Sequence, residues 1–260
     1  MNLNLSGKKA MVCGSTQGIG KASAIELATL GASVILVARN EEELNRVKSE
    51  LPGPGNHSYV VADFSKPDEL KVKINDYIQQ HGTVDILVNN TGGPNSGLIT
   101  EAKTDEFIQA FSSHLLCNHI LMQAVLGGMK KNGFGRIINI ISTSVKVPLK
   151  NLGVSNTTRA AVANWSKTLA NEVAPFGITV NNVLPGATMT ARLKSIVEAK
   201  SAKTGISKQE IEQEMLREIP MQRFAEASEV ANAVAFLASP AAAYITGINV
   251  PVDGGRTGSL

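Results

Sequence analysis

Cysteine is scarce in this sequence of 260 residues, which contains only Cys13 and Cys117. Cys13 lies in an apolar run typical of a β-strand, whereas Cys117 lies in a segment with a helical pattern. We interpret both as buried thiols in a reducing compartment. Two such cysteines do not make the disulfide framework of a small secreted protein.

Long apolar runs are also missing. The longest uncharged stretch, residues 230–252, is interrupted by residues that break regular structure: Asn232, Pro240, Gly247, Asn249 and Pro251. It therefore predicts a helix, a turn and a strand, and no span of a bilayer. The opening segment MNLNLSGKKAMV has no apolar stretch behind a basic one, so we predict no signal peptide. We expect a soluble, cytoplasmic protein without a membrane partner.

A large surplus of one charge is absent too. The sequence has 25 Lys and Arg against 22 Asp and Glu, a formal net charge of +3, and no basic block that would neutralise a run of phosphates. We therefore do not expect nucleic acid as a partner. The length and the 43% hydrophobic content fit one α/β domain over residues 1–260, and there are no repeats or low-complexity linkers.

Short β-branched runs alternate with longer amphipathic segments along the whole sequence. The strand candidates are KAMVCG, SVILVA, HSYVVAD, DILVNN, GRIINIIS, ITVNNVLPG and INVPVDGG. This alternation predicts an α/β fold with a doubly wound parallel sheet of about seven strands and helices on both faces. Capping residues three positions before an acid mark three helix starts: Asn40 with Glu43, Ser65 with Asp68, and Ser207 with Glu210.

One irregular segment, residues 187–222, interrupts the strand rhythm between Pro185 and Arg223. It is polar, rich in Lys and Glu, and helical in pattern. It follows the carboxyl end of a strand, which is where open α/β sheets bind ligands. We predict a substrate lid, and the alternative is a solvated pair of surface helices.

A glycine-rich motif, CGSTQGIGKASAIELA, follows the first strand and opens a helix. Gly14, Gly18 and Gly20 let the backbone turn sharply and present helix N-terminal N–H groups to a pyrophosphate. The spacing is G-x-x-x-G-x-G, which alone would also suit a plain strand-to-helix turn.

The next strand ends carry further candidate ligands. Arg39 stands where an NAD-selective site would place an acid, and its guanidinium suits a 2′-phosphate, so we expect NADP(H) in preference to NAD(H). An exposed arginine at a helix start is also ordinary. Asp63 could accept from an adenine amino group or serve only the following turn. Residues 89–93, NNTGG, place small side chains where a backbone must approach a cofactor closely.

Together these motifs resemble the short-chain dehydrogenase/reductase family from about Leu5 to Arg256. The resemblance is carried, in order, by GSTQGIG, NNTGG, GRIINIIS, GITVNNVLPGATMT, PMQRFAEASEVANAVAFLAS and ITGINVPVDGG. The sequence is most similar to members that resemble 3-oxoacyl-(acyl-carrier-protein) reductase. This implies a single Rossmann-type domain, a nicotinamide cofactor, a small carbonyl or alcohol substrate, and a homodimer or homotetramer.

The family's cofactor site carries over onto matching positions of this sequence, and no metal ligand is expected among them. These positions are Gly14, Ser15, Thr16, Gln17, Gly18, Ile19, Gly20, Arg39, Asp63, Phe64, Asn90, Thr91, Gly92, Arg159, Pro185, Gly186, Thr188 and Thr190.

The family's catalytic residues are an Asn, a Ser, a Tyr and a Lys, and only the Ser is matched, by Ser142. In the family the Tyr protonates a carbonyl oxygen as hydride arrives, the Lys holds the nicotinamide ribose, and the Ser orients the substrate. Counted from Ser142, the Tyr position holds Ser155 and the Lys position holds Arg159. The Asn position holds His114.

These replacements alter the expected chemistry. A serine hydroxyl does not titrate near neutral pH, so Ser155 is a poor acid that can still polarise a carbonyl. Arg159 cannot shuttle a proton, but it could grip the ribose hydroxyls and stabilise a developing alkoxide. His114 titrates near working pH and could act through a water, or it could be a hydrogen-bonded core histidine. Lys146 and Lys150 could meet an anionic substrate or be solvated.

Two functions follow from this sequence. The first is an NADP(H)-dependent oxidoreductase with an altered site, in which Ser142, Ser155, Arg159 and His114 are the candidate catalytic residues. The second is a catalytically silent NAD(P)-binding protein with a regulatory or structural role, which kept the fold and lost the acid.

Overall fold

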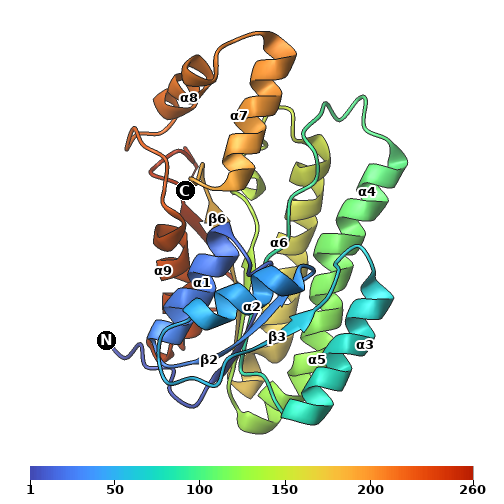
Figure 1. Ribbon diagram of the computed structural model, residues 1–260, viewed down its shortest axis with the longest axis vertical. Coiled ribbons are helices and arrows are strands. Elements are labelled where there is room, and N and C mark those ends of the chain that lie inside the picture. Colours follow the sequence, from blue (N-terminus) through green and yellow to red (C-terminus); the bar gives the residue numbers. More distant parts are fainter. Residues whose placement is uncertain (260) are drawn as a thin grey trace.

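Seven parallel strands form the central sheet of the computed structural model, which describes residues 1–259 (Figure 1). The strands are β1 (Lys9–Cys13), β2 (Ser33–Ala38), β3 (Ser58–Val61), β4 (Ile86–Asn89), β5 (Gly135–Ile140), β6 (Ile178–Pro185) and β7 (Asn249–Val252). Their order in the sheet is β3-β2-β1-β4-β5-β6-β7, and every neighbouring pair is parallel. The predicted doubly wound, Rossmann-type sheet is confirmed.

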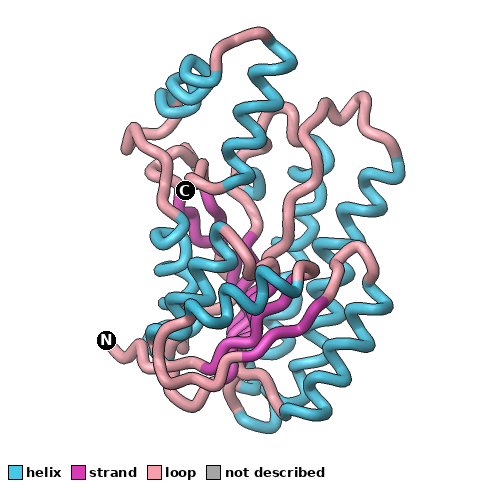
Figure 2. The backbone as a smooth tube through the Cα atoms, in the orientation of Figure 1, coloured by secondary structure: helices cyan, strands magenta, loops and turns pink. Residues whose placement is uncertain are grey.

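Helices cover both faces of the sheet, as Figure 2 shows by the helical segments on either side of the strands. One apolar core joins the strands to α1 (Gly18–Thr29), α2 (Glu41–Glu50) and α9 (Ala227–Ala238). A second core joins the opposite face to α3 (Pro67–His81), α5 (Cys117–Asn132) and α6 (Gly153–Val173). Shorter elements are α4 (Thr104–Phe111), the π-helix η1 (Ser112–Leu116), and the 3₁₀ turns η2 (Thr143–Val145), η3 (Ala174–Phe176) and η4 (Pro240–Ala242).

The inner strands consist almost entirely of buried residues, because a parallel sheet is covered on both faces. Cys13 ends β1 and Cys117 begins α5, and both are buried free thiols, as predicted. Burial raises the pKa of the Cys13 thiol, and burial with the nearby charge of Asp63 raises the pKa of Cys117 to about 12. Both thiols are therefore uncharged near neutral pH.

A row of asparagine side chains crosses four strands inside the apolar sheet. Asn89 Nδ2 donates to Asn139 Oδ1 over 2.8 Å, and Asn139 Nδ2 donates to Asn182 Oδ1 over 2.9 Å. Asn182 Nδ2 in turn donates to Asn249 Oδ1 over 2.8 Å. Since each amide must meet its partner in register, this row fixes the alignment of β4, β5, β6 and β7.

Two of the three predicted helix caps are confirmed. Asn40 accepts a hydrogen bond from the Glu43 backbone N–H at the start of α2. Ser207 and Glu210 form a reciprocal capping box at the start of α8 (Lys208–Arg217). Each pair satisfies N–H groups that have no partner within the helix.

The third predicted cap, Ser65 with Asp68, is wrong. Helix α3 begins at Pro67, and Lys66 occupies the capping position. Proline has no N–H and a fixed φ, so it suits the first helical position and moves the start past Ser65. Asp63 holds Ser65 instead, since its Oδ1 accepts from both the N–H and the hydroxyl of Ser65.

Helices α7 (Ala191–Thr204) and α8 stand beyond the carboxyl end of β6, at the top of Figure 1. Both lie within the predicted lid segment of residues 187–222. Two exposed ion pairs join them, Lys200 with Glu214 at 2.7 Å and Lys208 with Glu198 at 2.8 Å. Among residues 1–259, no helix combines the length and the apolar character needed to cross a membrane.

Candidate functional site

The candidate site lies where the order of strand addition reverses, between β1 and β4. From β1 the chain builds outward through β2 and β3, and it then returns to place β4 on the other side of β1. Open α/β sheets bind ligands in a crevice at the carboxyl ends of the strands on the two sides of such a reversal. The glycine-rich loop follows β1, and residues 90–93 follow β4.

The glycine-rich loop is packed so closely at Gly14 and Gly20 that a side chain would not fit at either position. Gly14 has a φ of +58°, and a Cβ built on it would lie 2.7 Å from the main-chain oxygen of Asn90. A Cβ on Gly20 would lie 2.1 Å from the oxygen of Gly14. Gln17 precedes α1 without a side-chain cap, so the first N–H groups of the helix have no side-chain acceptor.

Polar side chains hold this loop in place from neighbouring strands. Asn90 Nδ2 reaches the main-chain oxygens of Cys13 at 3.2 Å and Gly14 at 3.3 Å. The buried Ser15 hydroxyl accepts from the Val37 N–H in β2. Of the remaining loop residues, Thr16 and Ile19 are half-buried and Gln17 is exposed.

Arg39 and Asp63 lie at the ends of β2 and β3. Arg39 is exposed. Hydrogen bonds from Ser65 hold the pKa of Asp63 below its usual range, and the charge of Arg39 acts in the same direction. Asp63 thus serves the turn that follows it. Phe64 is half-buried, and its main-chain oxygen accepts from the Cys117 thiol.

The segment after β6 closes the other side of the crevice. Pro185 ends β6, and the Thr188 hydroxyl donates to the main-chain oxygen of Gly186 over 3.1 Å. Thr190 caps α7, and its Cγ2 lies 3.2 Å from where a Cβ would stand on Gly18. The start of α7 therefore contacts the glycine-rich loop directly.

Two serines with candidate roles lie close to element ends, Ser142 just after β5 and Ser155 at the start of α6. Ser142 Oγ accepts from the Ser144 N–H over 3.1 Å, which leaves its own proton free to donate. Ser155 is half-buried in the first turn of α6, and its hydroxyl makes no hydrogen bond within residues 1–259. Arg159 follows Ser155 by one helical turn, so both side chains lie on the same side of α6.

Arg159 is 8% exposed, and its Nη1 donates to the main-chain oxygen of Ile140 over 3.1 Å. No carboxylate within residues 1–259 forms an ion pair with it. Burial, together with the charge of Arg192, lowers the pKa of Arg159 to about 10. The side chain is therefore still a cation at neutral pH.

Arg192 was not among the residues predicted from the sequence. It lies in the first turn of α7, and its Nη2 donates to the main-chain oxygen of Pro94 over 2.6 Å. Its position was a usable signal, because the N-terminus of a helix disfavours a cation.

His114 lies on the π-helix η1, which interrupts the long helical segment between α4 and α5. Its ring is 3% exposed, and Nδ1 lies 2.5 Å from the Thr91 hydroxyl. Burial is the largest cause that lowers the pKa of His114 to about 2, and the charge of Arg159 lowers it further. A hydrogen bond with the Gly92 backbone acts in the opposite direction and raises the pKa. The expectation that this imidazole titrates near working pH is wrong, because it is removed from water beside a cation.

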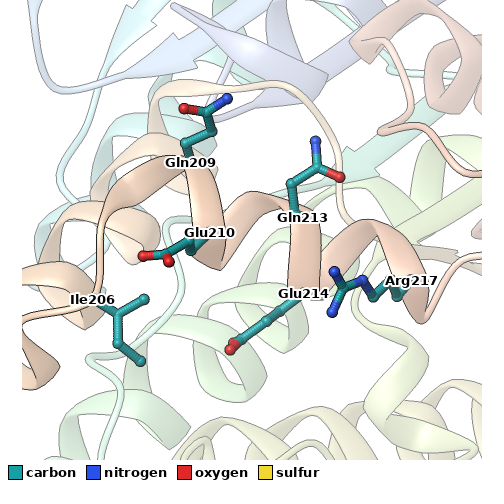
Figure 3. Close-up of a pocket in the computed structure, with 6 residues that line it drawn as sticks. All are labelled: Ile206, Gln209, Glu210, Gln213, Glu214 and Arg217. Atoms are coloured by element: carbon teal, nitrogen blue, oxygen red, sulfur yellow. The ribbon is translucent and has the colours of Figure 1, made fainter.

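Two hollows differ in their relation to these residues. A hollow of about 500 Å³ runs along α8 and is lined only by residues of the segment 206–217, drawn in Figure 3. It contains none of the predicted site residues. A smaller hollow of about 150 Å³ is lined by Val154, next to Ser155, and by residues after β4, among them Asn95, Gly97 and Leu98. The smaller hollow borders the candidate site.

The strand order and the glycine-rich loop after β1 are typical of a dinucleotide-binding fold, and comparison with known proteins agrees. The family profile described as enoyl-(acyl carrier protein) reductase matches residues 14–257. The chain belongs to the short-chain dehydrogenase/reductase family.

Individual relatives match over almost their whole length. The chain is 37% identical to 3-oxoacyl-(acyl-carrier-protein) reductase FabG of Pseudomonas aeruginosa, over 97% of this chain and 98% of that protein. It is 34% identical to the NADPH-dependent reductase BacG of Bacillus subtilis, over 98% of this chain and 100% of that protein. The crystal structure of L-sorbose reductase from Gluconobacter frateurii complexed with NADPH and L-sorbose superposes with a TM-score of 0.93, at 32% identity and complete coverage of both chains.

Proposed function

We propose that this chain is an NADP(H)-dependent oxidoreductase that acts on a carbonyl or hydroxyl group of a small molecule. The observation that carries the proposal is the fit of Gly20 beneath Gly14. Only a glycine at position 20 allows this contact, and the N-terminus of α1 has no side-chain cap. The names of the relatives FabG, BacG and L-sorbose reductase, all reductases, support the same reaction class.

The residues around the crevice suit a nicotinamide dinucleotide phosphate. The N–H groups of residues 14–20 would hold its pyrophosphate, and Arg39 would hold its 2′-phosphate. Thr188 and Thr190 would line the side nearest the nicotinamide, with Asn90 keeping the glycine-rich loop in shape. When bound, the cofactor supplies or accepts a hydride.

The protein's own residues would orient the substrate and stabilise charge. The hydroxyls of Ser142 and Ser155 would donate to the carbonyl oxygen, since neither proton is committed to another acceptor within residues 1–259. Arg159 would stabilise the negative charge that develops on that oxygen. Because neither serine nor arginine titrates usefully at neutral pH, solvent water would supply the final proton.

His114 would act as a positioning residue. Its neutral ring bonds to Thr91 and to the Gly92 backbone, so it fixes the loop that follows β4. It would not supply the proton, because a group with a pKa of about 2 is almost never charged at neutral pH.

The domain organisation, the cellular location and the assembly state are part of the same proposal. We expect one domain over residues 1–260, with residues 187–222 acting as a substrate lid. We also expect a cytoplasmic protein that forms a homodimer or homotetramer. Sedimentation analysis tests the assembly state directly, and a monomer would contradict that part.

A second candidate is a catalytically silent NAD(P)-binding protein. The observation that favours it is the lack of a titratable acid among Ser142, Ser155 and His114. This protein would bind the cofactor as tightly as an enzyme would, and it would turn over nothing.

Fluorescence titration with NADPH and NADH tests both candidates, and the absence of saturable binding would contradict both. A panel of ketones, aldehydes and acyl thioesters then separates them. Under the first, turnover falls about 10- to 100-fold for Ser142→Ala and for Arg159→Ala. Thr157→Ala, which removes an exposed hydroxyl from α6, is the matched control and keeps full turnover. Turnover unaffected by either site substitution would disprove the site assignment.

A further inference from the structure

We propose that Arg159 and Arg192 together bind a carboxylate of the substrate, so that the substrate is an oxo acid or the corresponding hydroxy acid. The assignment of the carboxylate to a substrate rests on the proposed function. The anion site itself rests on the convergence of two cations described below.

Both guanidinium groups reach the same point of the loop after β4. A Cβ built on Gly93 would lie 3.6 Å from Arg192 Nη2 and 3.7 Å from Arg159 Nη2. One side chain comes from α6 in the interior, and the other comes from the first turn of α7 in the lid segment. Glycine at position 93 thus leaves room between two positive charges.

Neither charge is compensated by the protein. Within residues 1–259 no Asp or Glu forms an ion pair with Arg159 or Arg192. A buried cation without a partner is strongly unfavourable, and a second cation nearby adds to the penalty. An anion placed between the two groups would remove both penalties.

Three further features favour an anion at this position. Each guanidinium is anchored by one main-chain oxygen, of Ile140 for Arg159 and of Pro94 for Arg192. An arginine has five N–H donors, so most remain available for planar, two-pronged recognition of a carboxylate. The N-terminus of α7 carries no acidic residue in its first turn, and its helix dipole attracts negative charge.

The location suggests a substrate in preference to the cofactor pyrophosphate. The glycine-rich loop and the N-terminus of α1 already suit the pyrophosphate. Arg159 lies instead one helical turn from Ser155, on the same side of α6. A carboxylate held there would lie close to the reacting carbonyl, as in 2-oxo and 3-oxo acids.

The kinetic test uses 2-oxo and 3-oxo acids of increasing chain length and their methyl esters, at constant ionic strength. We expect kcat/KM to favour the acid over its ester at least about 10-fold, as a two-pronged charged hydrogen bond allows. Arg192→Gln keeps a polar side chain and loses the charge, so the preference for the acid over its ester should disappear. The control is Lys194→Gln, which makes the same charge change at an exposed position of α7. This variant should keep the preference for the acid over its ester.

A binding test does not depend on turnover. Calorimetry with the 2-hydroxy and 3-hydroxy acids and their esters, with and without NADP⁺, should show binding of the acids that Arg192→Gln weakens. This result without any turnover would keep the anion site and reject the proposed enzyme. Equal binding of acids and esters would overturn the inference. So would weaker binding of NADPH alone by Arg192→Gln, because the pair would then serve the cofactor pyrophosphate.

Discussion

Arg159 Nη1 donates a hydrogen bond to the main-chain oxygen of Ile140 over 3.1 Å. The last residue of β5 thereby holds a cation of α6 at the position that the family gives to a lysine. The guanidinium is fixed in place without an acidic partner, so its charge is available to a bound molecule. Under the proposed function, this arrangement would keep the electrostatic part of the family's chemistry, and Ser155 would not replace the family's proton donor.

Restoring the family's pair tests whether the missing acid limits the reaction. The double substitution Ser155→Tyr with Arg159→Lys places a phenol beside an ammonium group. We expect turnover of ketone substrates to rise at least about 10-fold, since a positioned general acid typically contributes about 100- to 10,000-fold. The control Ser155→Phe with Arg159→Lys supplies the ring without the hydroxyl, and it should not gain. An equal gain in both variants would mean that shape, and not proton transfer, was limiting.

The close contact in the glycine-rich loop predicts a strong effect of a single methyl group. In Gly20→Ala the new Cβ would meet the oxygen of Gly14 at 2.1 Å, so the loop must shift. We expect NADPH affinity to fall about 100-fold and the free energy of unfolding to fall by about 2 kcal/mol. Fluorescence titration and urea unfolding measure the two effects. The control is Gly127→Ala, at an exposed position of α5 where the new Cβ would have no atom within 4 Å. This variant should bind NADPH normally, and its free energy of unfolding should rise by up to about 1 kcal/mol.

The charge of Arg39 predicts cofactor selectivity. Arg39→Ala removes the guanidinium beside the expected 2′-phosphate and leaves the rest of the nucleotide site intact. NADPH should bind about 10-fold more weakly, while NADH binding should not change. Arg46→Ala on the exposed side of α2 is the matched control. An equal loss of affinity for NADPH and NADH would show that Arg39 supports the loop and does not bind the 2′-phosphate.

Burial of His114 predicts sensitivity to acid. Its pKa is about 2 in the folded protein against an ordinary value of 6.5, so between these values the unfolded chain binds a proton that the folded chain refuses. Stability is therefore lost as the pH falls below 6.5, by about 1.4 kcal/mol per pH unit. His114→Asn removes this loss and should be more stable than the parent protein by about 2 kcal/mol near pH 5, relative to their difference above pH 7.

Urea unfolding at a series of pH values provides the measurement. His81→Asn, at the exposed end of α3, should keep the acid sensitivity of the parent protein. Parallel pH profiles for the parent protein and His114→Asn would show that His114 takes up its proton in the folded state.

The strands and their parallel arrangement follow closely from the sequence, since runs such as SVILVA must be covered on both faces and demand intervening helices. The asparagine row was not predicted. Asn139 and Asn182 lie in runs that periodicity alone assigns to an apolar core, and only the register of β5 with β6 makes them partners. A pairing across strands depends on alignment, which a linear pattern does not carry.

The candidate site was predicted unevenly for the same reason. The positions of Ser142, Ser155 and Arg159 follow from counting along the sequence. The pKa of His114 depends on burial beside Arg159, and the role inferred for Arg192 depends on Gly93, nearly a hundred residues away. Local sequence contains neither relationship, whereas the start of α7 did offer a clue in its unfavourably placed cation.

Helix α1 is covered by α9, although the two lie near opposite ends of the sequence. Leu27 of α1 and Val234 and Leu237 of α9 belong to the same buried cluster. During synthesis the ribosome completes α1 long before α9 emerges, so the apolar side of α1 stays uncovered in the nascent chain. The nucleotide loop that opens α1 thus reaches its final rigidity only when nearly the whole protein has been made.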